Sequence, residues 1–177
     1  KIVRPSNYPK GVPGKGRLII EKNGVKIGIL NLIGRVYMDS FAECPFQTAD
    51  RDISILRQHC KVIIVDFHAE ATSEKIALAC YLTGRVSAVI GTHTHVQTSD
   101  EKILDDKTAY ITDVGMTGPA DGVIGVNKMQ IIQKFITGLP VHFEPAKGKT
   151  CFNAVIIDID EKTGHSRSIT RISEIYN

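Results

Sequence analysis

The chain has 177 residues, of which 42% are hydrophobic and 23% charged, so it is long enough to form one globular domain with a buried core. The formal net charge of +3 is small and the basic residues are dispersed, which argues against a stable complex with nucleic acid. No apolar stretch approaches the roughly 20 residues that a membrane-spanning helix needs. Four cysteines without Cys-x-x-Cys spacing predict reduced thiols in a cytoplasmic protein, with Cys60 and Cys80 buried.

The amino-terminal part of the chain predicts a loop, a hairpin and a helix. Proline and glycine recur through residues 1–16 and favour a loop. Two segments of β type, 18–20 and 26–30, flank Asn23-Gly24, and this dipeptide favours a two-residue hairpin turn. Residues 48–59 carry an apolar stripe at helical spacing, and we expect a helix there.

The middle of the chain alternates strands with a helix. Residues 62–65 and 86–90 are apolar throughout, which is typical of strands buried on both faces. Between them a helix is expected from Thr72 or Ser73 to about Gly84. This alternation predicts a partly parallel sheet with helices packed on it. The predicted buried face of the helix consists of Ile76, Ala77, Cys80 and Tyr81.

The carboxyl-terminal part adds a short strand at 109–112, a glycine-rich loop at 113–125 and a helix at 127–137. Two further strands, 150–160 and 166–173, predict a second hairpin. Together the elements predict an α/β fold with a mixed sheet flanked by helices. The inward face of the last helix is expected to consist of Ile131, Ile132 and Phe135.

Three histidines follow the two buried strands. His68 comes just after the strand at 62–65, and His93 and His95 come just after the strand at 86–90. Ligand-binding and catalytic residues lie at the carboxyl ends of strands in such sheets, so we expect the three imidazoles to converge there and bind metal. The residues alone leave open whether both rings of the His-x-His pair bind one ion or each ring binds a separate ion.

Two carboxylates flank the first of these histidines. A ligand histidine usually donates its second ring N–H to a carboxylate or carbonyl, and Asp66 or Glu70 is placed to accept it from His68. Asp66 is equally a candidate metal ligand, and both residues are also compatible with helix capping or a solvated surface. The remaining histidines have no such surroundings and are interpreted as structural: His59, His142 and His165.

Three longer motifs closely resemble those of the YmdB-like bacterial metallophosphoesterases, which are calcineurin-like phosphoesterases. They are VDFHAEATSEK at 65–75, GTHTHVQT at 91–98 and TDVGMTGP at 112–119. Shorter segments of the chain match as well, at 4–9, 44–47 and 155–160. The resemblance covers nearly the whole chain.

This resemblance implies a calcineurin-like metallophosphoesterase fold and a metal-dependent phosphodiesterase that hydrolyses phosphate esters, notably 2′,3′-cyclic nucleotides. It implies two metal ions, iron or manganese with zinc and magnesium as alternatives, which activate a hydroxide. His68 and His93 would bind one ion and His95 the other. It also implies a homo-oligomer acting on a small phosphodiester or nucleotide substrate.

One departure from the family pattern is large. The family's other ligands are an aspartate, a bridging glutamate and an asparagine, and a further histidine is the general acid; all lie in amino-terminal motifs that this sequence lacks. The catalytic residue therefore stays unassigned. Residues 1–177 are predicted to form a single metallophosphoesterase domain without its amino-terminal strands, the carboxyl-terminal two-thirds of a longer protein. The alternatives are a non-catalytic metal-binding or regulatory fragment, and a hydrolase with a mononuclear three-histidine site.

Overall fold

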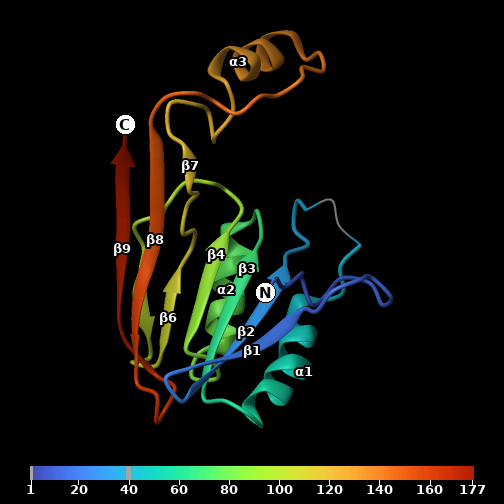
Figure 1. Ribbon diagram of the computed structural model, residues 1–177. Coiled ribbons are helices and arrows are strands. Elements are labelled where there is room, and N and C mark those ends of the chain that lie inside the picture. Colours follow the sequence, from blue (N-terminus) through green and yellow to red (C-terminus); the bar gives the residue numbers. More distant parts are fainter. Residues whose placement is uncertain (1, 39–40) are drawn as a thin grey trace.

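Two β-sheets of unequal size form the body of the protein in the computed structural model, which describes residues 2–38 and 41–177 (Figure 1). In this described part the larger sheet has six strands, in the order β1-β2-β3-β4-β6-β5, and the smaller has the order β7-β8-β9. The larger sheet comprises β1 (Arg17–Lys22), β2 (Val25–Ile33), β3 (Val62–His68), β4 (Ala88–Thr92), β5 (Lys102–Leu104) and β6 (Thr108–Ile111). The smaller comprises β7 (Gly118–Pro119), β8 (Thr150–Ile159) and β9 (Ser166–Tyr176).

The larger sheet is mixed, as the sequence predicts. Its centre, β2-β3-β4-β6, is parallel, and an antiparallel strand lies at each edge. The predicted amino-terminal hairpin is confirmed, since Lys22 pairs with Val25 across the turn. Asn23 and Gly24 have φ values of 53° and 80°, a left-handed pair that asparagine and glycine adopt most readily. The predicted hairpin at the carboxyl end is also confirmed by the pairing of β8 with β9.

Two helices, α1 (Pro45–Arg57) and α2 (Thr72–Leu82), pack against the larger sheet and against each other. The rings of Phe46 and Tyr81 join them, with centroids 5.4 Å apart. α1 begins three residues before its predicted start because Pro45 suits a first helical turn. No helix within the described ranges is long and apolar enough to cross a bilayer. The core between helices and sheet includes Leu30, Leu32, Ile53, Leu56, Ile63, Val65, Phe67, Leu78 and Leu82.

The predicted buried face of α2 is wrong. Ile76 and Tyr81 are 40% and 45% exposed, and Ala77 and Cys80 are exposed as well. The buried face is nearly opposite the predicted one and shares no residue with it. Two charged side chains take part in the burial, whereas an argument from apolar periodicity places charges outside. Cys60, in contrast, is buried as predicted. The buried residues of α2 are Glu74, Lys75, Leu78, Ala79 and Leu82.

The third helix, α3 (Lys128–Thr137), lies on a segment that projects beyond both sheets (Figure 1). Its bounds agree with the prediction, and the amide of Met129 donates to the Asn127 side chain at the amino-terminal cap. Its predicted inward face is wrong in part. Ile131 is buried, but Ile132 and Phe135 are 45% and 80% exposed, since the projecting segment offers them no core to pack against.

Candidate metal centre

His68 and His93 meet at the carboxyl edge of the larger sheet. His68 is the last residue of β3 and pairs with Thr92, the last residue of β4, so His93 follows directly beside it. The Nε2 atom of His68 lies 3.0 Å from the Nδ1 atom of His93. The two rings are nearly perpendicular, with centroids 4.8 Å apart. The parallel register of β3 and β4 therefore brings together two of the three predicted imidazoles.

The spacing of these two nitrogens fits a shared metal ion. Imidazole nitrogens bind transition-metal ions at about 2.0–2.2 Å, so two of them in neighbouring positions of an octahedral ion would lie about 3 Å apart. Burial lowers the pKa of His68, and the neighbouring His93 lowers it further. A lowered pKa favours the neutral imidazole, which is the form that binds a metal.

The outer nitrogen of His68 is held by a chain of polar groups. The Thr92 hydroxyl donates to Oδ1 of Asp66 over 3.0 Å, so its oxygen accepts from Nδ1–H of His68 at 3.2 Å. The Asn31 amide donates to the other oxygen of Asp66 over 2.7 Å. This arrangement protonates His68 at Nδ1 and turns the lone pair of Nε2 toward His93. Asp66 thus reaches His68 through Thr92 rather than directly.

Glu70 contacts the outer nitrogen of His93. Its Oε2 atom lies 3.1 Å from His93 Nε2, with both side chains partly exposed. A carboxylate only accepts hydrogen bonds, so a neutral His93 that donates a hydrogen bond from Nε2–H to Glu70 carries a lone pair on Nδ1. The lone pairs of His68 and His93 then face each other across 3.0 Å. Two facing lone pairs repel unless a cation, either a proton or a metal ion, lies between them.

His95 is placed differently. Its Nδ1 atom lies 3.1 Å from the carbonyl oxygen of Ile124, and its side chain is exposed. Within the part of the chain that the structure describes, no group of three or more His, Cys, Asp or Glu side chains is arranged to hold a metal ion. The structure thus unites His68 with His93 and directs His95 toward the glycine-rich loop. Assignment of the three histidines as ligands stays a prediction.

Sequence reasoning missed the polar residues that hold His68. Side-chain alternation suggests that Thr92 points away from the site, yet its hydroxyl contacts the His68 ring. Asn31 lies in an apolar strand, and its contact with Asp66 depends on the pairing of β2 with β3. A polar residue in such a strand was the available signal, because a buried amide needs a partner.

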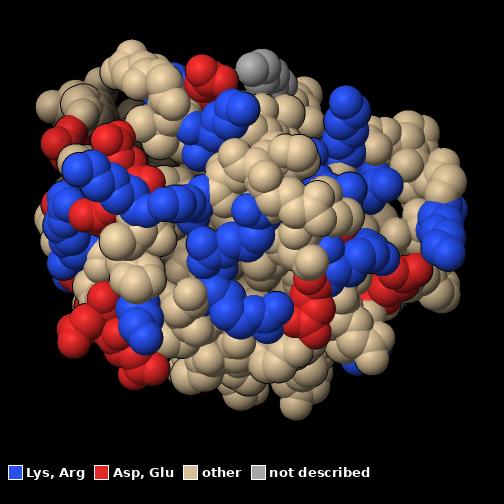
Figure 2. Space-filling model, turned by 90° about the horizontal axis from the view of Figure 1, so that it is seen from below, with Lys and Arg blue, Asp and Glu red and all other residues tan. Residues whose placement is uncertain are grey.

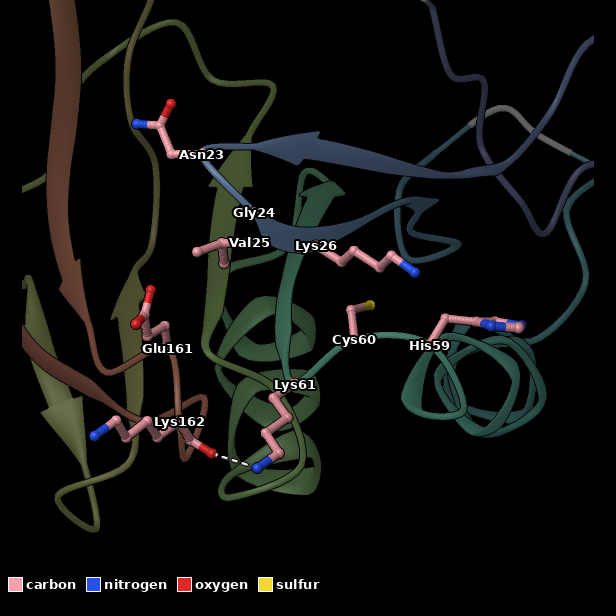
Figure 3. A pocket seen from close by; sticks show the side chains of 9 residues that line it. All are labelled: Asn23, Gly24, Val25, Lys26, His59, Cys60, Lys61, Glu161 and Lys162. Atoms are coloured by element: carbon pink, nitrogen blue, oxygen red, sulfur yellow. Dashed lines mark hydrogen bonds between the residues drawn. The ribbon is translucent and has the colours of Figure 1, made fainter.

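A pocket of about 410 Å³ lies at the opposite end of β3, away from the two imidazoles (Figure 3). His59 lines it together with Lys26, Lys61 and Lys162. The ammonium groups diverge in Figure 3, and that of Lys61 donates to the carbonyl of Lys162 over 2.7 Å. Seen from below, this side of the molecule carries basic side chains interspersed with acidic ones (Figure 2). The pocket is therefore not an extension of the metal centre.

The fold and site define an α/β protein with paired imidazoles at the carboxyl ends of adjacent parallel strands. The model of the YmdB-like protein family matches residues 1–172, and the chain belongs to this family.

Individual relatives agree with this assignment. A 2′,3′-cyclic-nucleotide 2′-phosphodiesterase of Bacillus subtilis (strain 168) is 51% identical over 171 residues, 97% of this chain and 64% of that protein. The crystal structure of a hypothetical protein from Thermus thermophilus has a TM-score of 0.92 at 41% identity and covers 99% of this chain and 68% of that one. The structure of a novel phosphatase from Mycoplasma pneumoniae has a TM-score of 0.89 at 39% identity and covers 98% of this chain and 63% of that one. The chain spans about three fifths of the length of the curated relatives it matches.

The polar chain through Thr92 makes a prediction about the protonation of His68. We expect His68 in the unmodified, metal-free protein to carry its proton on Nδ1, and Thr92→Val to shift it toward Nε2, because valine keeps the shape but neither accepts nor donates. The loss of stability should be about 1 kcal/mol. Nitrogen-15 NMR of the imidazoles at neutral pH measures the tautomer. Thr94→Val, which removes a hydroxyl that contacts the Val96 backbone and Asp113 but not His68, should leave it unchanged. An unchanged tautomer in the Thr92 variant would contradict the assignment.

Proposed function

We propose that this chain carries part of the metal centre of a phosphoric ester hydrolase that acts on 2′,3′-cyclic nucleotides. The observation that carries the proposal is the pair of facing nitrogens of His68 and His93, 3.0 Å apart, each with its outer nitrogen held by a polar partner. The phosphodiesterase relative, 51% identical over 97% of this chain, supports the substrate class. A calcineurin-like fold and a single domain over residues 1–177 are part of the same proposal.

The proposed division of the metal ligands follows the family resemblance, and the orienting roles of Glu70 and Asp66 follow from their contacts. His68 and His93 would hold one ion and His95 a second, and iron or manganese is expected, with zinc or magnesium as alternatives. Divalent ions supply charge neutralisation at the phosphoryl oxygens and hydroxide near neutral pH. Glu70 orients the His93 ring by accepting a hydrogen bond from its Nε2–H, and Asp66 orients the His68 ring through the Thr92 hydroxyl. The general acid stays unassigned.

A second candidate is a metal-binding or regulatory fragment without turnover. It is favoured by the absence, among residues 2–38 and 41–177, of a cluster of three or more side chains of ligand type. Two neutral imidazoles bind a dication more weakly than a set that includes a carboxylate. Metal analysis separates the candidates, because about two ions per chain are expected for the hydrolase and one or none for the fragment.

The hydrolase proposal predicts metal-dependent turnover of 2′,3′-cyclic AMP that depends on the three histidines. With Mn²⁺ or Fe²⁺ supplied, the unmodified chain should hydrolyse the substrate, though far more slowly than a chain that supplies the missing family ligands. His68→Ala, His93→Ala and His95→Ala should each lower the rate by more than roughly 100-fold, because loss of a ligand weakens metal binding. His59→Ala, in the pocket at the far end of β3, is the control and should retain the rate.

The outcomes of this assay are decisive for the assignment. Activity at the unmodified rate in the His68 or His95 variant would refute its role as a ligand. A complete absence of metal-dependent turnover by the unmodified chain would contradict the hydrolase and favour the second candidate.

The partner that we propose besides the substrate is a second copy of this chain, bound through α3. Apolar side chains on and after this helix are between 39% and 80% exposed and present on the order of 700 Å² of surface, close to the roughly 800 Å² that each partner contributes to a standard interface. A cytoplasmic location and the absence of stable nucleic-acid or membrane partners stay predictions. The exposed apolar residues are Met129, Ile132, Phe135, Ile136, Leu139 and Phe143.

Association through α3 predicts that polar substitutions on it give a monomer. Phe135→Ser with Ile136→Ser removes the two most exposed apolar side chains of the helix, each 80% exposed, and should convert an oligomer to monomers without loss of the fold. Light scattering after gel filtration measures the mass against the 19.4 kDa of one chain. Tyr37→Ser, at an 87% exposed aromatic residue outside α3, is the control. A monomeric unmodified chain, or an oligomer that survives the double substitution, would contradict the proposal.

A further inference from the structure

The carboxylate of Asp113 is fully buried and is bonded to the loop that carries the histidines. Its Oδ2 atom accepts from the Lys75 ammonium and from the backbone amide of Thr94, each over 2.9 Å. Its Oδ1 atom accepts from the amide of Gly115 over 2.9 Å. Burial raises the pKa of Asp113, but Lys75 and the two amides outweigh it and hold the pKa below its usual range. Asp113 therefore stays ionised with three donors around it.

The contact with Thr94 lies between the two histidines of the loop. His93 and His95 have φ values of 116° and 66°, in the left-handed region that residues other than glycine rarely adopt. Such residues persist only where the surroundings fix them, and they cluster at functional sites. The bond from the Thr94 amide to Asp113 is placed to fix both.

The backbone of Asp113 fixes the far end of the same loop. Its amide donates to the Thr98 hydroxyl over 3.0 Å, and its carbonyl accepts from the Thr98 amide over 3.0 Å. The segment can lie this close to β4 because Gly91 has no side chain: a Cβ there would lie 1.7 Å from the Thr112 carbonyl oxygen. Residues 94 to 98 are thus held at both ends by one residue that follows β6.

Lys75 connects this loop to the other histidine. It lies in the first turns of α2, which begins four residues after His68, and its side chain is 1% exposed. The ion pair between Lys75 and Asp113 consequently joins the element that follows His68 to the loop that contains His93. A buried ion pair is a rigid link, because separating the two charges would leave each of them buried without a partner of opposite charge.

We infer that Asp113 and Lys75 are positioning residues that set the backbone of the 93–95 loop and its distance from His68. Neither residue is among the predicted metal ligands. The inference rests on the proposed function in one respect only, namely that the paired imidazoles bind a metal ion. The positioning itself is a property of the metal-free chain and is measurable without turnover.

The test compares three variants of this chain. In Asp113→Asn one of the two acceptor oxygens becomes an NH₂ group, so at least one of the three donors loses its partner. Lys75→Met keeps the carboxylate and its amide bonds but removes the link to α2. Asp52→Asn is the matched control, because Asp52 is also a fully buried carboxylate with ion pairs, to Arg17 and Arg51. All three should lower the melting temperature.

Two measurements distinguish positioning from a general loss of stability. Hydrogen exchange at the Thr94 amide, followed by NMR without metal, should accelerate at least about tenfold in Asp113→Asn relative to Asp52→Asn. Calorimetric titration with Zn²⁺ should show affinity reduced by roughly 10- to 100-fold in Asp113→Asn and Lys75→Met, and unchanged in the control. If Asp113→Asn does not fold, the double variant with Lys75→Met, which leaves no unpaired charge, replaces it.

The outcomes separate this inference from the proposed function. Thr94 exchange and Zn²⁺ affinity in Asp113→Asn equal to those of the Asp52 control would overturn the inference. An unmodified chain that binds no Zn²⁺ would overturn the metal centre instead, and the Thr94 exchange rates would still decide whether Asp113 positions the loop.

Discussion

The parallel register of β3 and β4 is the constraint on which the candidate site depends. Because His68 lies opposite Thr92, the residue after β4 emerges beside the His68 ring, and the two imidazole nitrogens come within 3.0 Å. A shift of the register by one residue would turn every side chain of the strand to the other face. The buried pair of Lys75 and Asp113 then fixes the loops that leave these strands, so the sheet sets the meeting point and the ion pair sets the geometry.

Much of the fold follows from local patterns in the sequence. Asn23-Gly24 predicts its hairpin because both residues adopt a left-handed backbone at low cost, and the apolar run at 62–65 predicts a buried strand. The buried face of α2 cannot be predicted from local patterns, because the burial of Lys75 depends on Asp113, a partner 38 residues away. The prediction of the buried face of α3 fails for the opposite reason. The apolar pattern predicts the helix correctly, but nothing in the described chain covers Phe135.

The candidate site shows the same division. The three histidines are predictable because they follow two buried strands, and the proximity of His68 and His93 follows from parallel pairing. The role of the Asp113 carboxylate is not predictable, because it depends on a hydrogen bond to a loop that the chain pattern does not pair with it. Thr92 lies opposite His68 in the predicted pairing, but side-chain alternation suggests that its hydroxyl points away from the site. The position of His95 cannot be predicted from its place after a strand, because the backbone leaves β4 in a left-handed conformation and the His95 ring turns toward Ile124.

Whether His68 and His93 share one metal ion can be measured by anomalous X-ray diffraction from crystals of the chain grown with Mn²⁺ or Zn²⁺. A shared ion should give an anomalous peak between His68 Nε2 and His93 Nδ1, at roughly 2.0–2.2 Å from each nitrogen. A peak that contacts neither or only one of these imidazoles, or no peak at this edge of the sheet with the metal in excess, would contradict it.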